Sequence, residues 1–259
     1  MKQGKLDRAA VLKLCKALGV IAVCAIAFAY AVVYILHQGR FEENYSPDES
    51  HYIAMAQRLL TEGVYSYWGD GPDAYVSPGY PIFLTLCMAV FGTDVAGIDA
   101  IKFVQAFLSA GTVFLTFFLG WRLTKKYSVG ILAAMLLAAN GIYALYAKRL
   151  LTETFFCFTM MLFFAVFLVA VERGRWWLHL LSGALFCVTI FVRPLLLMTL
   201  PVLYIPLLLQ CWRSWKNDPW QTRFPWKRLL TPVGCFAAGV LVVGLPWWIR
   251  NVVSLGAFV

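Results

Sequence analysis

The sequence predicts an all-α, polytopic membrane protein with about seven transmembrane helices and a first extracytoplasmic loop that carries amphipathic juxtamembrane helices. Three observations predict this fold class. The 259 residues are 61% hydrophobic and only 14% charged, with a mean hydropathy of +0.74, whereas soluble domains have about 25% charged residues. Seven apolar runs approach the roughly 20 residues that a spanning helix needs. Lys and Arg gather beside these runs. A soluble globular enzyme is therefore excluded.

The predicted spans cover residues 17–36, 98–119, 127–146, 151–171, 176–192, 195–211 and 229–249. The first run follows a long basic segment without a clear cleavage site, so we expect it to stay as a helix and not to be a signal peptide. We interpret residues 1–259 as a single transmembrane module. Residues 1–16 form its cytoplasmic N-terminus, residues 37–97 its extracytoplasmic loop with surface helices, and residues 98–250 its six further spans.

The segment 79–91 is too short to cross a bilayer, and Pro78 and Gly92 bracket it. If it does not cross, fifteen of the 22 Lys and Arg lie on the cytoplasmic side; if it does, three basic clusters face outward, against the positive-inside rule. We therefore expect an interfacial or re-entrant helix on the outer face. The net charge of +9 then reflects orientation in the membrane, and no nucleic-acid partner is expected.

The first loop holds eight of the 13 Asp and Glu. Its stretch Ser46-Pro47-Asp48-Glu49 predicts a helix start, with Ser46 as N-cap and Glu49 closing a capping box, and Gly63 predicts the end. One apolar face of this helix is suited to lying along the bilayer surface. Capping accounts for Glu49 as well as catalysis does. Asp48 is not needed for the cap, and the positive helix end favours its ionised form, as a base or cation-holding carboxylate requires.

Further polar residues lie at the outer ends of the predicted spans: Lys148, Arg149 and Glu153 at one turn, Arg193 at another, and Arg250 after the last span. The cations suit either of two roles, snorkelling to lipid head groups or holding an anionic group such as a phosphate. Glu153 is costly near hydrocarbon unless it is paired or faces a wet cavity. Together they predict an outward-facing site for an anionic, lipidic ligand.

Five short motifs in order resemble the GT-C membrane glycosyltransferases, in particular the branch with protein O-mannosyltransferases, lipid A aminoarabinose transferases and galacturonosyltransferases. The motifs are Asp48-Glu49-Ser50-His51-Tyr52, Ser77-Pro78-Gly79-Tyr80-Pro81, Arg149-Leu150-Leu151-Thr152-Glu153, Val192-Arg193-Pro194 and Pro246-Trp247-Trp248-Ile249-Arg250-Asn251. The resemblance covers nearly the whole chain from residue 17.

The resemblance implies an inverting glycosyltransferase that moves a sugar from a polyprenyl-phosphate donor to a lipid, glycan or protein acceptor on the extracytoplasmic face of a bacterial cell membrane. Asp48 resembles the family's proposed base, and Glu153 its second acidic residue. The candidate residues are of three kinds: Asp48, Glu49 and Glu153 for catalysis; Arg58, Lys148, Arg149, Arg193 and Arg250 for the donor phosphate; and Tyr52 and Tyr80 for the substrate cavity.

The sequence departs from the family in two ways. Some relatives place a metal-binding acidic residue where Val76-Ser77-Pro78 stands, so no metal ligand is expected there, and whether a divalent cation takes part stays open. Relatives continue through more spans after the position of Val259, so we interpret the chain as C-terminally truncated. The alternative function is a catalytically inactive scaffold, or a membrane transporter or flippase.

Overall fold

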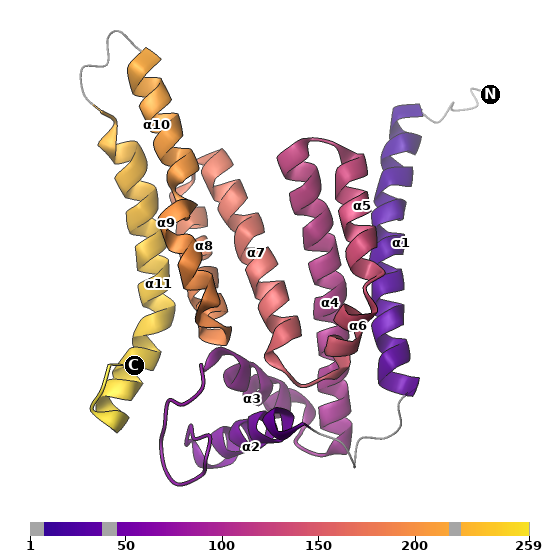
Figure 1. Ribbon diagram of the computed structural model, residues 1–259, viewed down its shortest axis with the longest axis vertical. Helices are drawn as coiled ribbons and strands as arrows, with labels where there is room; N and C mark the ends of the chain where they lie inside the picture. Colours follow the sequence, from indigo (N-terminus) through magenta and orange to yellow (C-terminus); the bar gives the residue numbers. More distant parts are fainter. Residues whose placement is uncertain (1–7, 38–45, 218–223, 259) are drawn as a thin grey trace, which may run out of the picture.

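The structure is a computed structural model that describes residues 8–37, 46–217 and 224–258, and every regular element in these ranges is a helix. The long helices stand side by side as an upright bundle, and two short helices lie across one end of it (Figure 1). The predicted all-α membrane fold is confirmed. The predicted N-terminal segment 1–16 lies partly outside the described residues, since the first helix begins at Arg8.

Five helical segments are long and apolar enough to cross a membrane. They are α1 (Arg8–His37), α4 (Val95–Thr124), α7 (Thr152–Arg173), the segment Pro194–Asn217 and α11 (Trp226–Leu255). The segment Pro194–Asn217 is built from the 3₁₀ helix η1 (Pro194–Thr199), α9 (Leu200–Leu203) and α10 (Ile205–Asn217). The helix α8 (Trp176–Val192) is apolar but has 17 residues. By length and composition the described chain offers five spans, or six if the bent pair of helices at Tyr127–Ala138 and Gly141–Lys148 counts as one, and the predicted count of seven is not confirmed.

The predicted span 127–146 is wrong as one continuous helix. It consists of α5 (Tyr127–Ala138) and α6 (Gly141–Lys148), which are bent by 60° relative to each other. The break has a local cause, because the Asn140 side-chain carbonyl accepts hydrogen bonds from the backbone N–H groups of Ile142 (3.1 Å) and Tyr143 (3.2 Å). Asn is favoured as the N-cap of a helix and disfavoured in a helix interior, so Asn140 starts α6 instead of extending α5.

The helix α2 (Pro47–Glu62) has the predicted start and end: Ser46 and Glu49 form the capping box, and Gly63 takes a left-handed conformation at φ 69°. The expectation that its apolar face lies on the bilayer surface is wrong. Ile53 and Ala56 of that helix are buried in one core with Leu84 of α3 (Gly79–Phe91).

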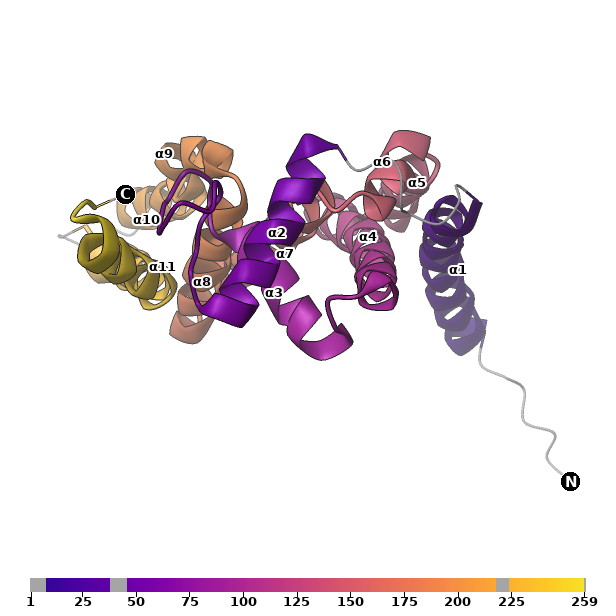
Figure 2. The ribbon, with the colours of Figure 1, turned by 90° about the horizontal axis from the view of Figure 1, so that it is seen from below.

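The helix α3 has the predicted bounds and lies under the bundle, where it packs against α4 and α8 (Figures 1 and 2). Tyr80 and Leu84 are fully buried there, together with Ile101 of α4 and Leu150 of the α6–α7 turn. The helices α2 and α3 therefore form a protein layer across the ends of the long helices, and this layer fixes where the loop residues lie.

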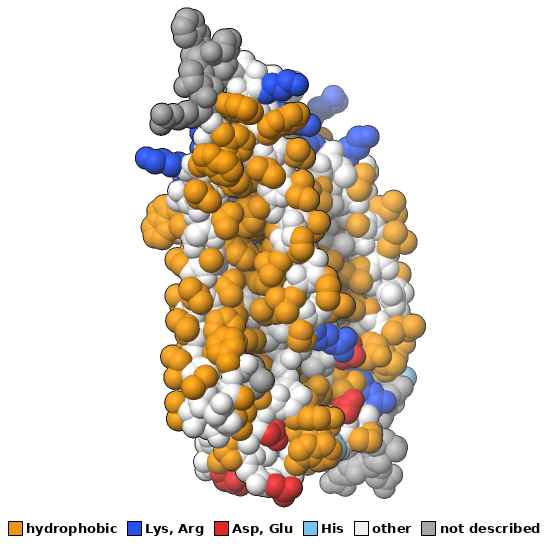
Figure 3. Space-filling model, turned by 60° about the vertical axis from the view of Figure 1, so that its left-hand side comes forward, with side chains coloured by type: hydrophobic (Ala, Val, Ile, Leu, Met, Phe, Trp, Pro, Cys, Tyr) orange, Lys and Arg blue, Asp and Glu red, His pale blue; other side chains and the backbone are white. Residues whose placement is uncertain are grey.

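Charged side chains are sorted along the bundle (Figure 3). On the face shown, hydrophobic side chains cover the middle, Lys and Arg crowd at one end, and Asp and Glu appear at the end that carries α2 and α3. This is the pattern expected for a helical bundle in which a basic flank faces the cytoplasm.

The helices α8 and α11 cross at very close range through two glycines. A Cβ atom at Gly183 of α8 would overlap the backbone of Phe236, and one at Gly239 of α11 would overlap the backbone of Leu180. Small residues at a crossing allow helices to pack closely in a membrane, where apolar transfer gives no driving force. This crossing fixes the position of α8, and Arg193 is the residue directly after that helix.

Candidate functional site

The first turn of α2 separates two neighbouring carboxylates. Asp48 is exposed, and it has no hydrogen bond or ion pair with any residue in the described ranges. Glu49 is 0% exposed. Asp48 is therefore open to solvent, whereas Glu49 is built into the protein.

Glu49 connects α2 to the turn between α6 and α7. Its Oε2 accepts from the backbone N–H of Ser46 (3.0 Å) and from Nη1 of Arg149 (3.0 Å), and its Oε1 accepts from the backbone N–H of Leu150 (2.9 Å). A buried carboxylate needs this set of donors to offset its desolvation. Glu49 thus holds Arg149 and the start of α7 against the loop. Lys148, the neighbour of Arg149, is also buried, at 6% exposure.

Glu153 and Arg193 form an ion pair between the start of α7 and the end of α8. Arg193 Nη2 lies 2.8 Å from Glu153 Oε1, and Arg193 Nε donates to Thr152 Oγ1 at 2.8 Å. Both charged side chains are partly open to solvent, at 41% for Arg193 and 30% for Glu153. This ion pair explains why Glu153 is tolerated at the edge of an apolar span, because its charge is paired. It also orients a guanidinium whose remaining N–H groups can reach an anion.

Tyr52 lies among these charges. Burial raises the pKa of its hydroxyl, the negative charges of Asp48 and Glu153 raise it further, and the positive charge of Arg193 lowers it. Asp48, Glu153 and Arg193 therefore lie within electrostatic range of Tyr52, although they come from three separate parts of the chain.

Tyr80 supports Tyr52 from below. The two rings meet edge to face with centroids 5.2 Å apart. Tyr80 itself is 0% exposed, and its hydroxyl donates to Oε1 of Gln105 at 3.1 Å. Of the two tyrosines predicted to line a substrate cavity, Tyr52 is therefore at the surface of the site and Tyr80 lies behind it.

Arg58 and Arg250 hold the loop between α2 and α3. Arg58 Nη1 donates to the carbonyl of Ser66 at 2.7 Å. Arg250 donates to the carbonyls of Asp73 (2.7 Å) and Tyr65 (2.9 Å), and its guanidinium lies over the Tyr65 ring, 5.4 Å from its centroid. The structure thus uses both arginines to fix loop carbonyls, whereas Arg193 is bound by side chains.

Two buried polar residues of α4 were missed by the sequence analysis. Gln105 is 0% exposed and donates to the carbonyls of Arg149 (2.6 Å) and Ala147 (3.3 Å) while it accepts from Tyr80. Lys102, one turn earlier, is 0% exposed and pairs with Asp99 at 2.6 Å. The signal was present in the sequence, because a lysine and a glutamine three positions apart interrupt an otherwise apolar span.

An aromatic cluster beside Asp48 was also missed. The His51 ring stacks on Tyr67 with centroids 4.5 Å apart and planes 8° apart, and Trp68 and Tyr75 pack around Tyr67. Trp68 and Tyr75 are 61% and 66% exposed. Exposed rings that pack together form a contiguous apolar patch, and such patches often mark a binding surface. The sequence signal was the run Tyr65-Ser66-Tyr67-Trp68.

Metal-ligating side chains do not gather at this end. Within the described ranges, no group of three or more His, Cys, Asp or Glu lies close enough together to hold a metal ion. The described residues there include the exposed carboxylate of Asp48, the oriented guanidinium of Arg193 and a set of aromatic rings.

The comparisons with known proteins give one match. A family model described as dolichyl-phosphate-mannose-protein mannosyltransferase matches residues 73–242, which is more than half of the chain and includes Glu153 and Arg193. A search of curated proteins gave no match. The apolar helical bundle, the polar groups gathered at one end of it and this match agree. The chain belongs to the dolichyl-phosphate-mannose-protein mannosyltransferase family and is an integral membrane protein, and this membership indicates a glycosyltransferase that uses a lipid-linked sugar donor.

Proposed function

We propose that the chain is one transmembrane module that moves a sugar from a polyprenyl-phosphate donor to an acceptor hydroxyl, with inversion at the anomeric carbon. The observation that carries this proposal is the convergence of Asp48 with the Glu153–Arg193 pair around Tyr52. It unites a carboxylate that can take a proton with a cation that can hold a phosphate, at the end of the bundle that carries α2 and α3.

In the proposed reaction Asp48 accepts the proton of the acceptor hydroxyl. The acceptor oxygen then bonds to the anomeric carbon from the side opposite the phosphate, and the bond between that carbon and the phosphate oxygen breaks. Its electron pair stays on the polyprenyl phosphate, which needs cationic stabilisation more than protonation. Direct displacement from the opposite side inverts the anomeric configuration.

Arg193 is the proposed phosphate ligand. Glu153 and Thr152 each hold one edge of its guanidinium, at 2.8 Å in both cases. A planar guanidinium with fixed orientation suits a phosphate, which it can contact through two parallel hydrogen bonds. Arg149 pairs with Glu49 in the turn before α7, and Lys148 is its buried neighbour. In this proposal both add positive charge to the donor side of the site.

We place this end of the bundle on the extracytoplasmic side of a bacterial cell membrane. The basic clusters lie at the opposite end, as Figure 3 shows for one face. Under the positive-inside rule that basic end faces the cytoplasm. The acceptor then approaches α2 from the outside, where Trp68 and Tyr75 are exposed.

The test is transfer from a defined donor by the full chain reconstituted in liposomes. With mannosyl-phosphate polyprenol and a library of hydroxyl acceptors, the wild-type chain should release polyprenyl phosphate and form an inverted glycoside. Arg193→Gln should lose about a hundredfold in kcat/KM, because the leaving phosphate loses its cation. Arg175→Gln, at the opposite end of α8, is the matched control and should retain activity.

Three outcomes would contradict the proposal. Retention of the anomeric configuration would exclude direct displacement, and equal activity of the Arg193 and Arg175 variants would remove Arg193 from the site. Tight donor binding without any transfer would identify the chain as an inactive scaffold.

A further inference from the structure

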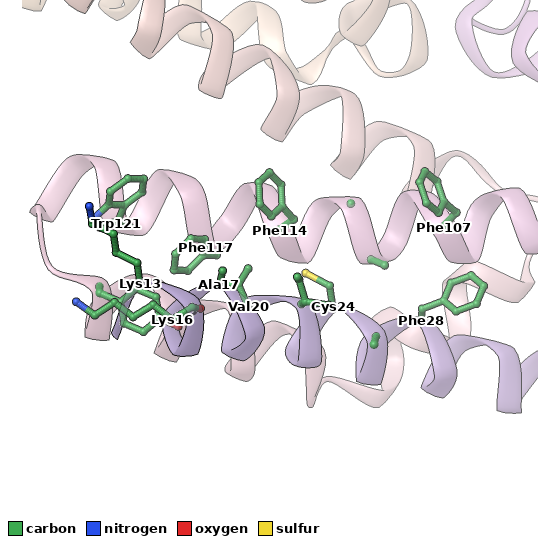
Figure 4. A pocket seen from close by; sticks show the side chains of 15 residues that line it. Lys13, Lys16, Ala17, Val20, Cys24, Phe28, Phe107, Phe114, Phe117 and Trp121 are labelled. Carbon is green, nitrogen blue, oxygen red and sulfur yellow. Dashed lines mark hydrogen bonds between the residues drawn. The ribbon is translucent and has the colours of Figure 1, made fainter. Parts of the chain in front are cut away.

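A long apolar groove runs along the helices α1 and α4, away from the polar end of the bundle (Figure 4). Its volume is about 1040 Å³. Small residues line it, Ala17 and Ala25 from α1 and Ala110 and Gly111 from α4, together with Phe114. A groove of this size on an apolar surface must be filled by something apolar in the membrane.

One end of the groove is polar. Lys13 and Lys16 of α1 line it together with Trp121 (Figure 4), and Tyr127 lies beside Lys16. Both lysines are exposed, and neither has an acidic partner among residues 8–37, 46–217 and 224–258. The Lys16 ammonium lies 5.4 Å from the centroid of the Tyr127 ring, and the Tyr127 hydroxyl donates to the Lys16 carbonyl at 2.8 Å.

These end residues mark the level of lipid head groups. Trp and Tyr concentrate where hydrocarbon meets water, and lysines there extend toward the head groups. From Lys16 the groove continues to Phe28 along α1, twelve residues or about 18 Å at 1.5 Å per residue. One leaflet of hydrocarbon is about 15 Å thick. The apolar part therefore matches the reach of an acyl chain of the same leaflet.

We propose that this groove binds one anionic phospholipid, with its phosphate at Lys13 and Lys16 and an acyl chain along α1 and α4. The two ammonium groups, which have no acidic partner in the described part of the chain, select an anionic head group over a zwitterionic one, since each cation near the head groups adds attraction to anionic lipid. The occupant is distinct from the proposed sugar donor, because that donor's phosphate would lie at the other end of the bundle, where Arg193 is.

The test uses the full chain purified in mild detergent. Phosphatidylglycerol and phosphatidylcholine are each titrated in, while bound lipid is counted by native mass spectrometry and the unfolding midpoint is recorded. The wild-type chain should retain one phosphatidylglycerol and gain thermal stability from it, with little response to phosphatidylcholine. The double variant Lys13→Gln/Lys16→Gln should bind phosphatidylglycerol about tenfold or more weakly.

Two further variants separate charge from shape. Arg213→Gln/Lys216→Gln removes two cations from α10 outside the groove, and it should bind lipid as the wild type does. Ala25→Phe fills the groove with the lysines intact, and it should also lose the lipid. Equal affinity for the two phospholipids, or an equal loss of phosphatidylglycerol affinity in the two charge variants, would overturn the proposal. A dimer that cross-links through Ala25→Cys would also overturn it, because a second copy would then fill the groove.

Discussion

At the scale of single residues, Asp48 and Glu49 are neighbours in the chain with opposite environments. A helix turns about 100° per residue, so one carboxylate faces outward while the next faces the turn between α6 and α7. Glu49 is buried with four donors, and Asp48 is exposed. The proposed base is therefore positioned by the residue that follows it.

The Glu49–Arg149 pair provides a stability prediction. Arg149→Met leaves the carboxylate of Glu49, which is 0% exposed, without its charged partner. We expect a loss of about 3 kcal/mol in the free energy of unfolding, because an uncompensated buried charge is expensive. Unfolding in mild detergent measures it. The double variant Glu49→Gln/Arg149→Met should recover part of the loss, and additive losses would show that the two side chains are not coupled.

Tyr65 provides a pH prediction. It is 3% exposed, its hydroxyl donates to the Val76 carbonyl at 3.0 Å, and its pKa is raised above the usual range, first by burial and then by the charge of Asp73. A raised folded-state pKa means that this stabilisation is complete below the unfolded pKa of 10.0 and is lost as pH rises above it. The wild-type unfolding midpoint should therefore fall steeply above about pH 10.

Tyr65→Phe tests that assignment. The variant loses a hydrogen bond worth about 1 kcal/mol near neutral pH, but its midpoint should fall less steeply in alkali because Phe does not ionise. Tyr75→Phe, at a ring that is 66% exposed, is the control and should follow the wild-type curve. Parallel curves for all three proteins would contradict the role of Tyr65.

Local residue pairs were predictable from the sequence, and distant ones were not. The Ser46–Glu49 capping box spans three positions, so the sequence alone indicates it. The contact of Glu49 with Arg149 joins residues 100 positions apart. No pattern in a single sequence reports such a distance, and the same holds for Gln105 and the α6–α7 turn.

At the scale of elements, the crossing of α8 and α11 depends on Gly183 and Gly239. Gly183→Ala puts a methyl group into the backbone of Phe236, so the helices must separate. We expect a loss of about 1–3 kcal/mol in stability and weaker transfer, because Arg193 follows α8. Gly234→Ala is the matched control on α11, since nothing lies within 4 Å of a Cβ there. Equal stability of the two variants would show that the crossing tolerates the methyl group.

Element limits were predictable where the chain carries clear stop signals. Pro78 and Gly92 bound α3 as predicted, and Gly63 ends α2. The break at Asn140 was missed because hydropathy stays high across it and only the side-chain cap reveals it. The burial of α2 on α3 was missed because an amphipathic face looks the same whether protein or lipid covers it.

At the scale of the whole molecule, acidic groups lie at the end of the apolar bundle that carries α2 and α3 (Figure 3), whereas Lys13 and Lys16 of the α1–α4 groove lie near the start of α1, at the other end (Figure 1). Composition predicted the membrane fold, since a chain with 14% charged residues leaves few alternatives. The number of spans was less certain from sequence, because α8 has 17 residues and the α5–α6 pair is bent. The order of motifs predicted the family over the stretch that the family model matches.

The most direct test of the account is the turnover of Asp48→Asn at saturating polyprenyl-phosphate sugar. Removing the proposed base should lower kcat by about a hundredfold or more. Donor affinity and the unfolding midpoint should stay unchanged, because Asp48 has no side-chain hydrogen bond or ion pair within the described ranges that the change would break. Asp70→Asn, an exposed carboxylate of the same loop, should turn over at the wild-type rate. Full turnover by Asp48→Asn would contradict the account.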